Sequence, residues 1–216
     1  MTAAALDHLV VATPTLEAGA AWCEATFGVA PSAGGKHPQM STHNRVLKVS
    51  SDTFPDVYVE IIAVDPDAPP PGRKRWFGLD DLDLSAGPRL IHLVARSTML
   101  DMHRWGLINV GLHPGDPIHA SRATPQGTLS WQILVPEDGS VSCGGALPTL
   151  IQWQGRHPTA GMADSGVTLE ALALHGVPDR ARDVLRLRGV SVTADAGPAL
   201  SARFHTPRGE ITIESR

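Results

Sequence analysis

The stretch that decides the fold runs from Leu6 to Pro14 and has the sequence LDHLVVATP. Its aliphatic and β-branched residues are typical of a buried strand, in which every second side chain points to the same face. His8 is therefore expected to share a face with Leu6 and Val10. A polar ring among apolar neighbours needs partners inside the protein, so this strand carries both core residues and a candidate functional group.

The residues that follow this strand predict a helix and then three further strands. Thr15, just after the turn at Thr13-Pro14, is suited to cap a helix that continues to Phe27. Extended runs follow at about residues 29–32, 43–50 and 56–64. The order of elements is therefore β-α-β-β-β.

The same order returns twice along the chain. A second copy has a strand at 89–95, a helix at 97–106 and extended runs at 118–122, 128–135 and 148–154. A third, shorter copy begins at Thr168, and such repetition is the main architectural signal. We expect an α+β fold in which repeated βαβββ modules form a cupped mixed sheet with helices on the outside. The expected modules span residues 1–64, 89–158 and 167–216, and residues 65–88 form a connection with no core of its own.

Composition excludes several classes of partner. The chain has 216 residues and a formal net charge of -4, without a basic face that would bind nucleic acid. No continuous apolar run of about 18 residues is present, so a membrane span is not expected. The N-terminus has no positive charge ahead of its apolar run, and Asp7 and His8 lie inside that run, unlike a secretory signal, which favours a cytoplasmic protein.

Short motifs are informative mainly through their absence. Cys23 and Cys143 have no CxxC spacing and are expected to be free thiols. The sequence contains no GxSxG elbow, no HExxH and no GxGxxG after a strand, so hydrolase, zincin and dinucleotide-binding functions lack support.

Polar residues occupy matching positions in the first two modules. Glu60 shares a face with Tyr58 and Ile62 in the last strand of the first module, while the second module has His92 in its first strand and Gln152 in its last. A buried glutamate needs a cation or several donors. Two explanations stay open: a divalent metal held by nitrogen and oxygen donors, or core histidines with ordinary hydrogen bonds and a glutamate that reaches water.

These and neighbouring residues carry a resemblance to a known family. The sequence resembles the vicinal-oxygen-chelate superfamily, and more closely its glyoxalase-like branch, over about residues 5 to 158. The resemblance rests on Leu6–Pro14, Gly35–Pro38, Thr42–Asn44, Tyr58–Asp65 and Leu150–Trp153. The superfamily includes isomerases, extradiol dioxygenases, antibiotic-resistance proteins and catalytically silent binders.

The resemblance implies a metal site at the centre of the cup. Its ligands would be His8, Glu60, His92 and Gln152, and Glu60 would also shuttle a proton as the catalytic residue. The implied metal is Zn, Ni, Co, Mn or Fe, and a protein without metal stays open. The expected walls of the cup include Leu6, Val10, Tyr58, Ile62, Leu90 and Val94.

Residues that bind substrate are expected around this site. His37, His43 and Asn44 lie in or beside a glycine-rich stretch, and Arg96 and Arg122 are suited to hold a carboxylate. Tyr58, on the face of Glu60, completes this set. Residues 155–158 have the pattern Gly-basic-His-Pro, like residues 35–38, and are expected to line the same pocket.

Three functions follow as hypotheses. The first is metal-dependent lyase or isomerase chemistry of the glyoxalase type on a small molecule with vicinal oxygens. The second is a metal-free binding protein with the same cup. The third is an extradiol-type dioxygenase with iron held by His8, His92 and Glu60. All three have a small-molecule partner, and a homodimer stays open.

Overall fold

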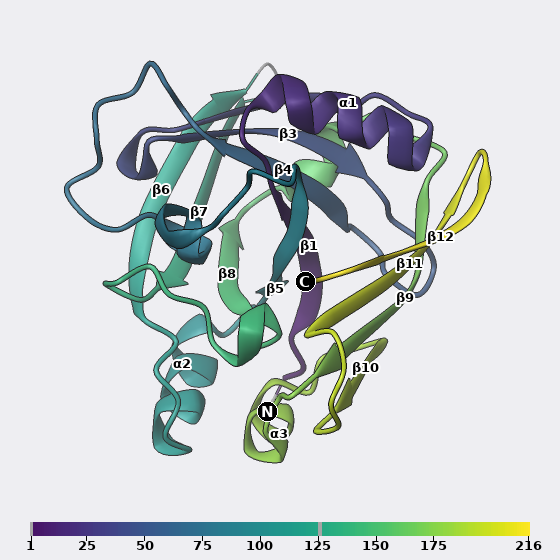
Figure 1. The fold of residues 1–216 in the computed structure, drawn as a ribbon. Coiled ribbons are helices and arrows are strands. Elements are labelled where there is room, and N and C mark those ends of the chain that lie inside the picture. The colour runs from purple at the N-terminus through teal and green to yellow at the C-terminus, as the bar shows by residue number, and fades with distance from the viewer. Residues whose placement is uncertain (1, 125–126) are drawn as a thin grey trace.

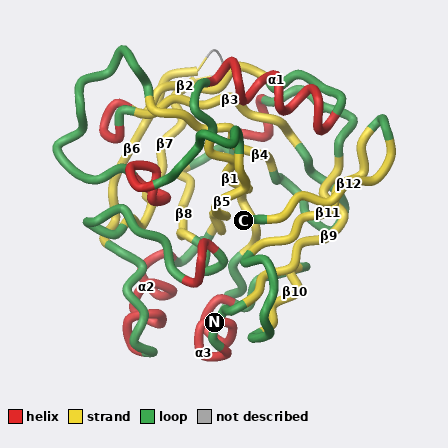
Figure 2. Tube along the Cα trace, viewed as in Figure 1, coloured by secondary structure: helices red, strands yellow, loops and turns green. Residues whose placement is uncertain are grey.

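The computed structural model describes residues 2–124 and 127–216, which form two sheets and three α-helices (Figures 1 and 2). The first unit consists of β1 (Ala5–Ala12), α1 (Leu16–Phe27), β2 (Ser32–His37), β3 (Thr42–Lys48) and β4 (Tyr58–Val64). The second consists of β5 (Arg89–Arg96), α2 (Leu100–Asn109), β6 (Asp116–Thr124), β7 (Gly127–Val135) and β8 (Thr149–Gln154). The third consists of β9 (Thr168–His175), α3 (Asp179–Leu185), β10 (Val190–Thr193), β11 (Leu200–Thr206) and β12 (Gly209–Glu214).

The first two units share one eight-stranded sheet, in the order β2-β3-β4-β1-β5-β8-β7-β6. Strands β1 and β5 pair antiparallel at its centre, and each pairs in parallel with the last strand of its own unit. The sheet curls until its edges approach one another, where the Gln39 side chain donates a hydrogen bond to the His119 carbonyl oxygen at 3.1 Å. The predicted α+β class and the cupped sheet of βαβββ units are confirmed.

Strand β2 lies further along the chain than the sequence predicts. The expected run was 29–32, whereas the strand spans Ser32–His37 and includes Gly34 and Gly35. A Cβ atom on Gly34 would lie 2.0 Å from Oδ1 of Asn44 on β3. The glycines therefore permit the close approach of two strands, where their composition suggested a loop.

Two β-bulges set which side chains face into the cup. The pairing of β1 with β5 shifts register between Leu6 and His8, and again after Val10. At the first bulge Asp7 is an extra residue of β1. Leu6, before it, belongs to the core cluster on the outer face of the sheet, called the outer core, whereas His8 and Val10, after it, face into the cup. Leu90 also belongs to the outer core, so the expected cup walls at Leu6 and Leu90 were wrong. The other expected wall residues line the inner cluster or the site cavity: Val10, Tyr58, Ile62 and Val94.

The connection between the first two units helps to fill the cup. It has no separate core, but a short 3-10 segment, Trp76–Asp81, buries the side chains of Trp76, Phe77 and Leu79 in the inner apolar cluster. The ring of Trp76 stacks on that of Phe77 with centroids 5.4 Å apart. The connection thereby supplies aromatic groups that line the site.

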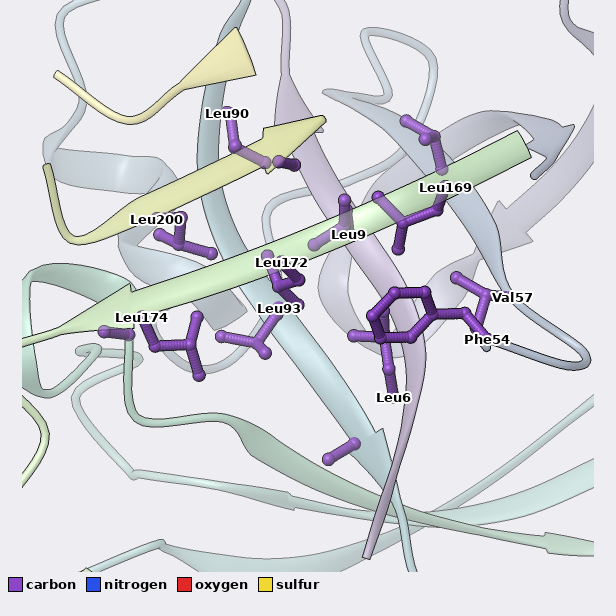
Figure 3. Close-up of a cluster of buried hydrophobic side chains, with 14 of the residues drawn as sticks. Leu6, Leu9, Phe54, Val57, Leu90, Leu93, Leu169, Leu172, Leu174 and Leu200 are labelled. Carbon is purple, nitrogen blue, oxygen red and sulfur yellow. The ribbon is translucent and has the colours of Figure 1, made fainter. Parts of the chain in front are cut away.

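The third unit covers the outer face of the central strands. Its four strands have the order β10-β9-β11-β12, so β9 pairs with β10 and β11 and not with the last strand as in the first two units. Figure 3 shows β9 crossing over β1 and β5, with leucines of the two layers packed together. The labelled leucines of this contact include Leu6, Leu9, Leu93, Leu169, Leu172 and Leu174.

Two further expectations concern single features. Cys23 and Cys143 are free thiols, as predicted. Among the described residues, no helix has the length and apolar character needed to cross a membrane.

Candidate functional site

The centre of the site is an ion pair inside the cup. His8 on β1 and Glu60 on β4 face the same cavity, and Nε2 of His8 lies 3.5 Å from Oε2 of Glu60. Val10 pairs with Glu60 and His8 with Tyr58 across these parallel strands, which places all four side chains on one face. The Tyr58 ring stacks on the His8 ring with centroids 4.6 Å apart. Both charged side chains are buried, His8 at 4% and Glu60 at 5% exposure.

Neighbouring strands hold the glutamate in place. Asn44 on β3 donates its amide hydrogen to Oε1 of Glu60 at 2.6 Å. His37 at the end of β2 lies beside Asn44, and its Nδ1 is 3.1 Å from the Thr42 hydroxyl. One carboxylate oxygen of Glu60 is thus fixed by an amide, while the other faces His8.

A second carboxylate lies behind His8. Asp7 has no exposed surface, and the bulge at this residue brings its side chain to the histidine that follows it. Oδ1 of Asp7 accepts a hydrogen bond from Nδ1 of His8 at 2.7 Å. Its Oδ2 accepts hydrogen bonds from Trp153 Nε1 at 2.9 Å and from His157 Nε2 at 3.0 Å. The carboxylate fixes both the orientation and the Nδ1 proton of His8.

The two carboxylates determine the charge of His8. Burial by itself lowers the pKa of His8, but hydrogen bonds and charges of Asp7 and Glu60 raise it to about 9. Burial raises the pKa of Glu60, but His8 and its other neighbours lower it to about 2. For Asp7, burial is likewise outweighed by His157 and His8, which hold its pKa well below the usual range. At neutral pH the site therefore contains an imidazolium between two carboxylates.

His92 occupies a different environment. Its Nδ1 lies 2.8 Å from the Gly145 carbonyl oxygen, and its Nε2 accepts from the Thr149 amide at 3.2 Å and lies 2.9 Å from the Thr149 hydroxyl. Burial lowers the pKa of His92 to about 4, so the ring is neutral. Both ring nitrogens are engaged in this arrangement, as expected for a core histidine.

Gln152 lies on the opposite face of the sheet. In β8, Ile151 belongs to the inner cluster and Trp153 lines the site cavity, so Gln152 between them points outward. Its Oε1 accepts a hydrogen bond from the Leu100 amide at 3.0 Å. Leu100 is the first residue of α2, so Gln152 satisfies a free amide at a helix start.

The donors present do not fit the expected metal ion. The structure brings His8 and Glu60 together, but it does not bring Gln152 to them, and His92 has other partners. Within residues 2–124 and 127–216, no three His, Cys, Asp or Glu side chains form a group that could hold a metal. No reaction step is therefore assigned to a metal here.

The predicted substrate-binding residues divide into two groups. His37, Asn44, Tyr58 and Arg122 line the cavity that contains His8 and Glu60. Arg96 instead donates hydrogen bonds to the carbonyl oxygens of Leu6, Pro55 and Asp56 at 2.7–2.9 Å, which joins β5 to β1 and to the loop before β4. His43 lies outside the cavity, with its Nδ1 4.0 Å from Oδ1 of Asp65.

Two cavities meet in the cup. The inner one, at His8 and Glu60, has a volume of about 30 Å³. The outer one has a volume of about 410 Å³ and opens between β2, β6 and β7. His37, Trp76 and Trp131 line both cavities, so the two cavities adjoin at these residues.

Several contributors to the site were not assigned by sequence reasoning. Asp7 was passed over because a regular strand would point it away from His8, and a bulge is not visible in the alternation of apolar residues. Trp76 lies in a proline-rich connection. Trp153 follows Gln152, which was expected to face the cup, so Trp153 was expected on the outer face of the sheet. The sequence did give a signal for His157, through the pattern it shares with residues 35–38.

Comparisons with known proteins identify the family. The family described as Glyoxalase-like domain matches residues 6–203. This chain belongs to the glyoxalase-like domain family. The resemblance to the vicinal-oxygen-chelate superfamily is thereby confirmed, and the match extends into the third unit.

One solved structure supports the fold of this glyoxalase-like chain. A hypothetical protein from Staphylococcus aureus has a TM-score of 0.55 at 12% identity, covering 99% of this chain and 86% of that one. A methylmalonyl-CoA epimerase from Mycobacterium tuberculosis has a TM-score of 0.42 at 15% identity, covering 73% of this chain and 91% of that one. The first of these likenesses shows the fold alone. A search of curated proteins gives no match.

Proposed function

We propose that this glyoxalase-like protein is an isomerase or lyase that moves a proton at a carbon next to a carbonyl group. The observation that carries this proposal is the His8–Glu60 pair, buried at the floor of the cup with its two facing atoms 3.5 Å apart. Buried charged pairs with strongly shifted pKa values are concentrated at functional sites. The substrate class is a small molecule with vicinal oxygens.

Substrate binding would turn Glu60 into a base. In the free protein the charge of His8 lowers the pKa of Glu60 to about 2, which makes it a weak base. A substrate oxygen that accepts the Nε2 hydrogen of His8 would take away the hydrogen bond from His8 that helps to lower the pKa of Glu60. Burial would then raise the pKa of Glu60 above its value in the free protein, which makes the carboxylate a better base.

The proposed step needs only groups of this chain. Glu60 takes the proton from the substrate carbon, the electron pair moves to the carbonyl oxygen, and His8 donates a hydrogen bond to the resulting enolate. Glu60 then returns the proton to the same carbon. Where that carbon carries a hydroxyl, the hydroxyl proton passes to the neighbouring oxygen, and Glu60 returns its proton to the former carbonyl carbon. Asn44 keeps the carboxylate in position, and Arg122 is placed to pair with a substrate carboxylate.

A metal-free binding protein is the second candidate. It is favoured by one observation, that Glu60 is already hydrogen-bonded to Asn44 and paired with His8 without a ligand. Extradiol-type chemistry is not favoured, because the nitrogens of His92 are engaged by Gly145 and Thr149.

Deuterium exchange separates the first two candidates. Pyruvate, 2-oxobutyrate and dihydroxyacetone would be incubated with the protein in D₂O and followed by proton NMR. We expect exchange above background for at least one compound, and a loss of about 100-fold or more in Glu60→Gln. Glu60→Gln keeps an oxygen for Asn44, and His43→Ala, outside the cavity, is the control. Binding without exchange would overturn the enzyme proposal in favour of the binding protein.

A further inference from the structure

We infer that the substrate is a two-part molecule, with a compact oxygenated head at His8 and Glu60 and an uncharged, flat apolar tail in the outer cavity. The assignment of the head depends on the proposed function, whereas the assignment of the tail depends only on the outer cavity. The inference therefore narrows the substrate class from any small molecule with vicinal oxygens to those that carry an aromatic or similar group.

The sizes of the two cavities support a molecule with two parts. The inner cavity, at about 30 Å³, has room for only a few atoms beside His8 and Glu60. The outer cavity, at about 410 Å³, is in the range of pockets that bind whole organic ligands. A substrate consisting of the head alone would gain nothing from the outer cavity.

The cavities lie in series, which lets one molecule reach both. His37, Trp76 and Trp131 belong to the lining of each cavity. The His37 ring meets the Trp76 ring edge to face, with centroids 5.1 Å apart. The ring centroids of Trp131 and Trp153 lie 5.3 Å apart, and Trp153 lines the inner cavity. A ligand that passes from one cavity to the other must therefore contact aromatic rings.

The lining of the outer cavity suits an uncharged tail. Apart from the basic residues, its lining is apolar or neutral: Pro38, Gln39, Met40, Trp76, Ala120, Ser121, Ser130, Trp131 and Gln154. Lys36 is paired with Asp65 at 2.8 Å, so its charge is already compensated. Burial keeps His37 neutral, with a pKa lowered to about 4. Tryptophan rings make favourable contacts with flat aromatic groups, which points to a ring in the tail.

Two hydrogen-bond donors beside the inner cavity lack partners. Nε1 of Trp76 and Nη1 of Arg122 are buried and make no hydrogen bond within the described part of the chain. Both residues line the inner cavity, and Trp76 lines the outer one as well. Buried donors of this kind are costly, and oxygen atoms of a bound head would satisfy them.

Calorimetric titration with pyruvate, phenylpyruvate and indole-3-pyruvate tests the inference. These compounds share the same head and differ in the tail. We expect the aromatic acids to bind at least about tenfold more tightly than pyruvate. Ala120→Phe, which places a bulky ring in the outer cavity, should remove this preference, whereas pyruvate, which has no tail, should still bind. Ala123→Phe, on the same strand but outside both linings, is the matched control.

The outcomes distinguish this inference from the proposed function. Equal binding of pyruvate and the aromatic acids, or binding of none of them, would overturn the inference, as would a preference that survives Ala120→Phe. Ser121→Phe, at an exposed lining position, replaces Ala120→Phe if that variant does not fold. Preferential binding of aromatic acids without deuterium exchange would support the tail and overturn the proposed proton transfer. Deuterium exchange without a preference for the aromatic acids would support the proposed proton transfer and overturn the tail.

Discussion

Asp7 controls the charge of the site although it does not line the inner cavity. It accepts hydrogen bonds from His8, Trp153 and His157, and it has no contact with solvent. A fully buried carboxylate is stable only with such partners. Its role is to position His8 and keep it protonated, in the way that carboxylates orient histidines in many sites.

The variant Asp7→Asn tests this role. Without the negative charge of Asp7, only Glu60 opposes the effect of burial, so the pKa of His8 should fall clearly below about 9. Loss of the buried pair should also cost about 3–5 kcal/mol in the free energy of unfolding. NMR titration of the His8 ring and urea unfolding measure the two effects. A His8 pKa that stays near 9 in Asp7→Asn would contradict the assignment.

The shifted histidines predict a stability maximum near pH 6.5. Because folding raises the pKa of His8 from 6.5 to about 9, its contribution to the free energy of unfolding is complete below pH 6.5. This contribution is lost as the pH rises through 9. His37 and His92 have pKa values lowered to about 4, so their contribution is present above pH 6.5 and is lost as the pH falls through 4. Urea unfolding from pH 4 to 10 should show both declines, and His8→Gln should flatten the alkaline one. A profile in His8→Gln identical to that of the wild type would disprove the link.

At the scale of elements, Gln152 belongs to the start of helix α2. Gln152→Ala should lose about 0.5–2 kcal/mol of stability, because the Leu100 amide loses its acceptor. Gln152→Glu should instead be neutral or stabilise by about 0.3–1 kcal/mol, since a carboxylate at a helix N-terminus interacts favourably with the helix dipole. Urea unfolding measures both changes.

The same variant decides whether Gln152 could act toward a metal. We expect calorimetry with Zn²⁺ and Mn²⁺ to show no gain in affinity in Gln152→Glu, since this side chain lies on the face away from His8. A clear gain in affinity would contradict the assignment of Gln152 to the helix and restore it as a metal ligand.

The pairing of β2 with β3 depends on glycine. A Cβ at Gly34 would lie 2.0 Å from Oδ1 and 2.4 Å from the backbone oxygen of Asn44. Gly34→Ala should therefore destabilise by about 1–3 kcal/mol and displace the Asn44 amide that holds Glu60. Gly72→Ala, where nothing lies within 4 Å, is the control and should change stability by less than about 0.5 kcal/mol. Urea unfolding and the NMR shift of the Asn44 side-chain amide report the two effects.

At the scale of the whole molecule, both sheets share one core. Leu172 of β9 is buried in the same cluster as Leu9 and Leu93 (Figure 3). We expect a single cooperative unfolding transition, seen alike by tryptophan fluorescence and circular dichroism. Leu172→Ala should cost about 2–5 kcal/mol, and exposed Arg203→Ala less than about 0.5 kcal/mol. Separate transitions would show that the third unit is an independent domain.

The sequence alone determined the order of elements and one half of the site. The positions of His8 and Glu60 among apolar neighbours in β1 and β4 marked them as candidate site residues, because a two-residue period is a local property of strands. The repeated order of elements predicted the cupped sheet in the same way. Local pattern is sufficient wherever a strand stays regular and one of its faces is clearly marked.

Only the tertiary structure decided the rest of the site. The bulge at Asp7 brings adjacent side chains together, and the outward face of β8 gives Gln152 to a helix. Trp76 enters the cup from a connection that has no strand or helix pattern. These features depend on strand register and on contacts between distant segments. In addition, a strand that is buried on both sides is apolar on both faces, so the alternation of residues cannot show which face lines the cup.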